Sequence, residues 1–224
     1  MLIHVQKIIL TVLLILSYFL AFSQHNDSKN QEVNSFGILS KENSDSSIYI
    51  QAYTFIKELK IKEANQLVSQ LQKTNPNYKE LYFLKGLIFA LKGKYAHAIS
   101  NFNTVLENNP KHEKALYNRA LAKALLDDYK SAIEDLNKCI AINPNYTLAY
   151  YSRGYWNEIM RNFNEAISDY QKTIVLYKYF NEAYLALAYV YYQTGDKINA
   201  CETLKKATSE GMSAASDLFQ NYCQ

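Results

Sequence analysis

Small and large apolar residues recur along this chain at a fixed interval of 34 positions. One set would lie in the first helix of each repeat: Ala52, Gly86, Ala120, Gly154 and Ala188. A second set combines an alanine with a larger residue four positions later: Ala64 with Val68, Ala98 with Phe102, Ala132 with Leu136, Ala166 with Tyr170, and Ala200 with Leu204. Small residues let two helices cross closely, and a large neighbour fills the groove beside them. The pattern therefore predicts one helical hairpin repeated along the chain.

The chain's three prolines follow the same interval, at Pro76, Pro110 and Pro144. A proline just past a helix ends it, because it cannot donate the next backbone hydrogen bond and it clashes with the preceding turn. Gly93 and Gly195 fall at the expected inner turns, where glycine tolerates the left-handed conformation. These signals predict five units: 45–78, 79–112, 113–146, 147–180 and 181–214.

In its interval and its small-residue positions, the sequence resembles the tetratricopeptide repeat family. The resemblance covers residues 45–214 and implies an all-α fold, a right-handed α-solenoid of about five helix-turn-helix hairpins. Beyond Gly211, the residues Leu218, Phe219 and Tyr222 stand at helical spacing. They predict a short capping helix over 215–224 that covers the last hairpin.

The N-terminus has the pattern of an export signal over residues 1–23. Lys7 precedes an apolar run over 8–22, and Ala21 and Ser23 place small residues where a signal peptidase reads. An uncleaved membrane anchor is the rival interpretation, although a span needs about 20 apolar residues. Residues 24–44 are polar and predict a flexible linker. Both interpretations place the repeats outside the cytoplasm, in the periplasm or cell envelope, with secretion as a further destination.

The three cysteines have different surroundings. Cys139 occupies a small-residue core position and is predicted to be a buried apolar side chain. Cys201 lies ten residues before Gly211 and Cys223 twelve after it, so an antiparallel bend would bring them to similar heights. This tail also resembles that of many exported bacterial tetratricopeptide proteins. We expect a disulfide that fastens the capping helix; the alternative is two unpaired thiols on different faces.

The family resemblance also implies a concave groove, lined by the first helices, that binds a protein or peptide. Its lining would be these residues: Tyr49, Tyr53, Phe83, Leu87, Tyr117, Leu121, Tyr151, Tyr155, Tyr189 and Tyr192. Tyrosine is abundant, with 20 against ten phenylalanines, and it combines a large apolar face with a polar tip suited to interfaces. The alternative is that many of these rings pack between neighbouring helices.

Other functional classes find little support in the sequence. His97 and His112 have no companion at metal-ligand spacing. The pairs Asp127–Asp128 and Glu134–Asp135 resemble capping and solvated-face residues rather than an acid and base. There is no Gly-rich phosphate loop, and the net charge of +3 is spread without a Lys/Arg run. We therefore predict no catalytic site, no metal, no cofactor and no nucleic-acid partner.

The function expected from these features is a non-catalytic scaffold or adaptor of the bacterial cell envelope that binds a peptide or protein segment in the groove. Contact with a membrane is expected only if the N-terminal segment is retained, which would make the protein a membrane-anchored assembly factor. A glycan-binding module that stacks sugars on tyrosines is a further alternative.

Overall fold

The computed structural model describes residues 41–223, so the predicted signal and most of the predicted linker lie outside the described residues. Within them the chain is all-helical, and no strand occurs. The helices are α2 (Lys41–Lys57), α3 (Ile61–Thr74), α4 (Leu81–Leu91), α5 (Tyr95–Asn108), α6 (Glu113–Ala124), α7 (Tyr129–Ile142), α8 (Thr147–Ile159), α9 (Phe163–Leu176), α10 (Asn181–Gln193), α11 (Lys197–Ser209) and α12 (Ser213–Cys223).

The helices form two compact units, divided between Leu91 and Lys92. The first unit contains α2, α3 and α4, in which α3 packs against both neighbours and α2 also contacts α4. Asp45 is buried at the start of this unit and accepts a 2.9 Å hydrogen bond from Asn75 Nδ2. Helix α2 begins at Lys41, four residues before the predicted start of the first repeat.

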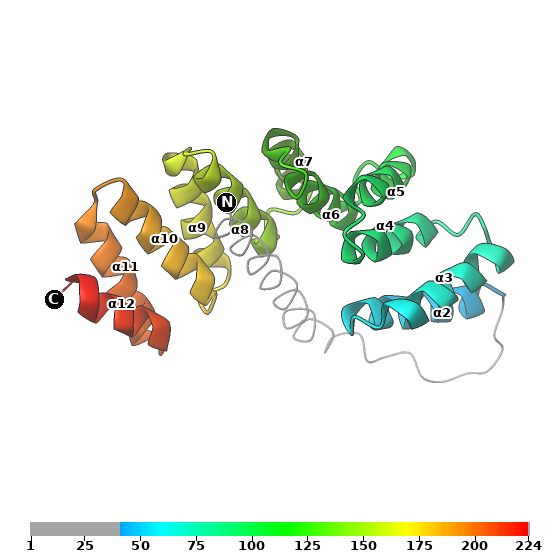
Figure 1. The fold of residues 1–224 in the computed structure, drawn as a ribbon, viewed down its shortest axis with the longest axis horizontal. Coiled ribbons are helices and arrows are strands. Elements are labelled where there is room, and N and C mark those ends of the chain that lie inside the picture. The colour runs from blue at the N-terminus through cyan, green and yellow to red at the C-terminus, as the bar shows by residue number, and fades with distance from the viewer. Residues whose placement is uncertain (1–40, 224) are drawn as a thin grey trace. The chain divides into compact units, whose positions relative to one another are not determined.

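In the second unit, consecutive helices pack as antiparallel hairpins (Figure 1). The pairs α6–α7, α8–α9 and α10–α11 each make extensive contact, and each hairpin packs against the next. The alanines of the second helices and the large residues four positions later are buried, as the 34-residue pattern predicts. Helices α8 and α9 lie close together at Gly154, because a Cβ added there would be 3.0 Å from the Tyr170 ring.

One backbone feature recurs at the same point of all five 34-residue repeats, in the turn between two consecutive helices. The residue with positive φ recurs every 34 positions, at Leu59, Gly93, Asp127, Arg161 and Gly195. Only two are glycines, so the packed helices impose a left-handed conformation on Leu59, Asp127 and Arg161, which L-residues adopt at a cost. The turn geometry therefore follows from the repeat rather than from glycine.

Side chains cap the N-termini of α6, α7 and α11. Asp128 accepts a hydrogen bond from the Ser131 amide, and Asp196 accepts one from the Asn199 amide. His112 Nδ1 accepts from the Ala115 amide at 3.1 Å. These contacts satisfy amides that the first helical turn leaves without partners. They confirm the capping role predicted for the Asp127–Asp128 pair, which Asp128 performs, and they give His112 a structural role.

Helix α12 begins as the first helix of another unit would. The Ala215 amide donates to the Met212 carbonyl, as the Ala183 amide does to Phe180. Met212 and Ala215 are buried, whereas Leu218 is 36% exposed and Phe219 half-buried. The most deeply buried contacts of this helix are therefore in its first turn rather than along the predicted stripe; the side chain of Tyr222 lies outside the described residues.

Candidate functional site

Four of the ten predicted groove residues are buried and cannot line an open groove: Phe83, Leu87, Tyr117 and Tyr151. The rings of Tyr117 and Tyr146 lie 5.2 Å apart, and those of Tyr151 and Phe180 lie 4.7 Å apart. Burial raises the pKa of Tyr151 well above its usual range, and nearby carboxylates, Glu182 first, add to this effect. The groove prediction is wrong for these four residues because they fill space between packed elements.

A second aromatic position explains the burial of Tyr117 and Tyr151. A ring stands 29 residues after the first-helix ring, just before the next first helix, and the two rings meet in Tyr49–Tyr78, Tyr117–Tyr146 and Tyr151–Phe180. The downstream rings also recur at the repeat interval, so the sequence contained a signal for aromatic filler. Aromatic pairs at 4.5–7 Å stabilise such packing beyond their buried area.

The other six predicted residues reach solvent to different extents. Four are half-buried: Tyr49, Tyr53, Leu121 and Tyr155. Tyr49 and Tyr53 stack on each other with centroids 6.0 Å apart, in the first unit. Tyr189 and Tyr192 are 48% and 49% exposed and stand one turn apart on α10. Thus the aromatic surface of the second unit is most open at its C-terminal end.

Tyr189 and Tyr192 border a pocket of about 240 Å³ formed by α10, α11 and α12. Its walls are mainly apolar, and its polar side chains include Gln193 and Lys197 as well as the two phenols. The complete lining is Leu185, Ala188, Tyr189, Tyr192, Gln193, Lys197, Ala200, Cys201, Leu204, Leu218 and Cys223. Two exposed aromatic rings beside an apolar hollow suit the binding of an apolar side chain.

A disulfide joins α11 to α12 in the wall of this pocket. Cys201 and Cys223 lie 5.6 Å apart at their Cα atoms, within the range a disulfide requires. Cys139 is buried, as predicted, and burial raises the pKa of its thiol to about 12. Since the thiolate is the reactive form, Cys139 is chemically inert while it remains in the core.

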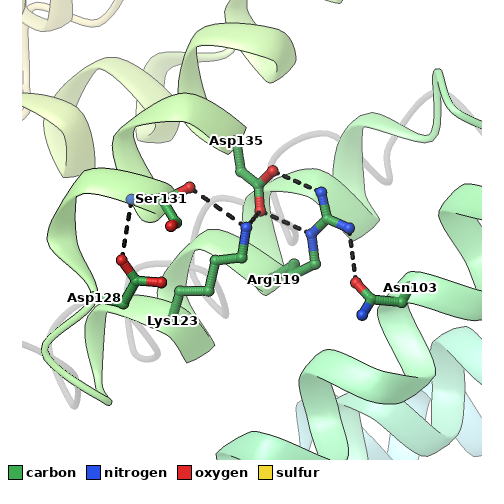
Figure 2. Close-up of polar contacts among 6 residues, drawn as sticks. All are labelled: Asn103, Arg119, Lys123, Asp128, Ser131 and Asp135. Atoms are coloured by element: carbon green, nitrogen blue, oxygen red, sulfur yellow. Dashed lines mark hydrogen bonds and ion pairs between the residues drawn. The ribbon is translucent and has the colours of Figure 1, made fainter.

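A buried polar network was missed by the sequence analysis. Figure 2 shows the Arg119 guanidinium between Asn103 on α5 and Asp135 on α7. Arg119 donates to the two Asp135 oxygens at 2.8 and 2.6 Å and to Asn103 Oδ1 at 2.7 Å. Lys123 Nζ lies 2.8 Å from Asp135. Asp135 is only 1% exposed, so placing it on a solvated face was wrong.

The network recurs one repeat later. Arg153 on α8 donates to Asp169 on α9 at 2.9 and 2.6 Å and to Asn137 on α7 at 2.7 Å. Burial is the largest influence on the pKa of Asp169 and raises it, whereas Arg153 acts in the opposite direction. Each arginine thus connects three consecutive helices, and the recurrence of Arg and Asp every 34 positions was a signal for this structural role.

Within residues 41–223, no three His, Cys, Asp or Glu side chains gather in a way that could hold a metal ion. In the same range, each helix is too short or too polar to cross a membrane. The predicted signal at 1–23 lies outside this range. The open aromatic pocket on α10–α12 is the candidate functional site.

Comparison with known proteins supports the repeat assignment. Models described as tetratricopeptide repeat match residues 79–112, 113–146 and 182–210. No curated protein matches the sequence. A crystal structure of MamA has 23% identity and a TM-score of 0.64, with 80% of this chain and 99% of that chain covered.

Two further solved structures have the same fold. MamA from Desulfovibrio magneticus RS-1 has 21% identity and a TM-score of 0.66, covering 77% of this chain and 97% of its own. YrrB, described as a TPR protein with an unusual peptide-binding site, has 18% identity and a TM-score of 0.60, covering 75% and 88%. These likenesses confirm the predicted fold class, an all-α array of helix-turn-helix hairpins.

Proposed function

Because this chain is a tetratricopeptide repeat protein, we propose that it is a non-catalytic scaffold that binds a peptide or protein segment through the pocket on α10–α12. The observation that carries this proposal is the pair Tyr189 and Tyr192, each about half exposed beside an apolar hollow. Tyrosine is enriched among the residues that dominate binding energy at protein interfaces.

The size of the pocket favours a side chain over a small-molecule ligand. Small-molecule sites typically occupy about 300–1,000 Å³, whereas this pocket measures about 240 Å³. A leucine, methionine or phenylalanine side chain from a partner would fill it, while the phenol hydroxyls, Gln193 and Lys197 could bond to the partner's backbone or polar groups. The YrrB description offers a precedent for peptide binding in this fold.

Replacing both Tyr189 and Tyr192 by alanine should weaken peptide binding about thirtyfold, since loss of an interface hot spot costs about 2 kcal/mol or more. Peptides that bind the wild-type protein would be selected from a random display library. Their affinities for the wild type and the variants would then be measured by fluorescence anisotropy. Tyr179→Ala is the matched control, because Tyr179 is 51% exposed and does not line the pocket. Equal affinity for all three proteins would remove the pocket from the proposal.

We further propose that the scaffold acts outside the cytoplasm, in the bacterial cell envelope. Two features support this placement: the signal-like pattern of residues 1–23 and the disulfide between Cys201 and Cys223. Structural disulfides persist mainly in oxidising compartments. Mass spectrometry of the protein purified from a bacterial host should find Gln24 at the N-terminus; an intact N-terminus in the membrane fraction would favour the anchored form instead.

A further inference from the structure

We propose that the Cys201–Cys223 disulfide controls the binding pocket by holding α12 as one of its walls, so that reduction by a dithiol weakens peptide binding. The inference rests on the proposed function and adds its regulation. Both cysteines line the pocket, and α12 contributes Leu218 as well as Cys223. A change in the position of α12 therefore changes the binding surface itself.

Helix α12 packs mainly against one neighbour, α11, and that packing is uneven along its length. Burial is concentrated at Met212, just before the helix, and at Ala215 in its first turn. The disulfide acts at the opposite end, at Cys223, the last residue of the helix. Gly211 precedes α12 with a φ of +87°, and an added Cβ there would meet nothing within 4 Å. Without the bond, α12 would remain attached mainly through its first turn and could pivot beside Gly211.

Helix α12 also carries polar residues at positions where the preceding first helix has apolar ones. Ser216 and Gln220 stand where the preceding first helix has Tyr184 and Ala188, when Met212 is matched to Phe180. Polar residues at these positions end the stacking of apolar hairpins, as terminal repeats require for solubility. They also mean that α12 has packing on one side only, which is the side that the disulfide secures.

The bond is accessible to reagents because both cysteines are half-buried. A thiolate of the dithiol attacks one sulfur, the S–S bond breaks, and the departing sulfur takes the electron pair and then a proton. The second thiol of the reagent resolves the mixed disulfide. Two electrons and two protons thus convert the cystine to two thiols, and the dithiol becomes a disulfide. By linkage, a peptide that prefers the closed pocket must also disfavour reduction.

The test compares the full mature chain in oxidised form, after dithiothreitol treatment, and as the Cys201→Ser/Cys223→Ser variant. Hydrogen–deuterium exchange of amides in α12 should accelerate about tenfold or more in the last two forms, because a cross-link restricts local opening. Exchange in α6 and α7 should stay unchanged. The affinity for a peptide selected on the oxidised protein should fall about tenfold. The serine variant with and without dithiothreitol controls for other effects of the reagent.

Exchange in α12 that differs less than twofold between forms would overturn the inference, as would equal peptide affinity in oxidised and reduced protein. Equal affinity would leave the proposed function standing, since the peptide would still bind. Failure of every form to bind any selected peptide would instead defeat the proposed function, and the regulation with it. The two failures are therefore distinguishable in one set of measurements.

Discussion

Replacing Arg153 by methionine is expected to lower the free energy of unfolding of the second unit by about 3–5 kcal/mol, because it leaves the buried Asp169 carboxylate without its cation. Arg153 holds this carboxylate through two hydrogen bonds, at 2.9 and 2.6 Å. Methionine keeps much of the apolar stem, so the lost charge dominates the effect. Urea unfolding followed by circular dichroism measures the change.

The chain contains its own matched control for this prediction. Arg119→Met removes the equivalent guanidinium, but Lys123 remains 2.8 Å from Asp135 and still neutralises it. In the second network, the position of Lys123 is occupied by the neutral Asn157. We therefore expect Arg119→Met to cost only about half as much, on the order of 2 kcal/mol. A larger loss at Arg119 than at Arg153 would contradict this account of the network.

Acid should reduce the cost of Arg153→Met. Burial already raises the pKa of Asp169, and removing the guanidinium that opposes this effect should raise it further. A carboxyl whose folded pKa lies above its unfolded value, about 3.9, favours the folded state when protonated. That contribution is lost as the pH rises through the folded pKa. The difference between variant and wild type should therefore be smaller at pH 5 than at pH 7, and a constant difference would exclude this explanation.

The repeats could be predicted from sequence because their signals are local and recur in register. Pro76, Pro110 and Pro144 end elements whatever lies elsewhere in the fold, and small residues mark the crossings at a constant interval. The disulfide was expected for a similar reason, since one turn at Gly211 brings two short segments together. These features depend on neighbours within one or two hairpins.

The candidate site was harder to predict because exposure depends on which partner meets each side chain. Tyr151 and Tyr189 were both expected in the groove, yet Phe180 covers Tyr151, whereas Tyr189 remains half exposed. The pocket also depends on α12. Met212 precedes α12 as Phe180 precedes α10, and these two equivalent residues are 32 positions apart rather than 34. A period fitted to the regular units could not anticipate that shift.

Asp135 was misplaced for a related physical reason. A carboxylate on a second helix is usually solvated, and only a cation on another helix allows its burial. That cation, Arg119, lies 16 residues earlier, a spacing with no meaning in a single helix. Once hairpins are stacked, the spacing brings Arg119 onto Asp135 and Arg153 onto Asp169. The network therefore becomes interpretable only when the hairpin geometry is known.

Replacing Gly154 by valine is expected to destabilise the second unit by about 3 kcal/mol. A Cβ at this position would lie 3.0 and 3.1 Å from the Tyr170 ring and 3.1 Å from Asp169 Cβ, and valine adds two methyl groups beyond it. Tyr170 is fully buried and its hydroxyl donates a 2.7 Å hydrogen bond to Glu158, so the ring cannot move away easily. Overpacking a core in this way costs about 1–3 kcal/mol or more.

A smaller substitution, Gly154→Ala, combined with Tyr170→Leu separates crowding by the ring from the intrinsic helix preference of the new residue. The preceding hairpin accommodates Ala120 at the glycine position, with Leu136 in place of the tyrosine. Gly154→Ala should therefore cost about 1 kcal/mol with Tyr170 present, and should become neutral or stabilising beside leucine, since alanine favours a helix by about 1 kcal/mol over glycine. Thermal unfolding of the wild type, the two single variants and the double variant measures the coupling free energy between positions 154 and 170. Strict additivity would mean that the ring of Tyr170 does not determine the need for glycine.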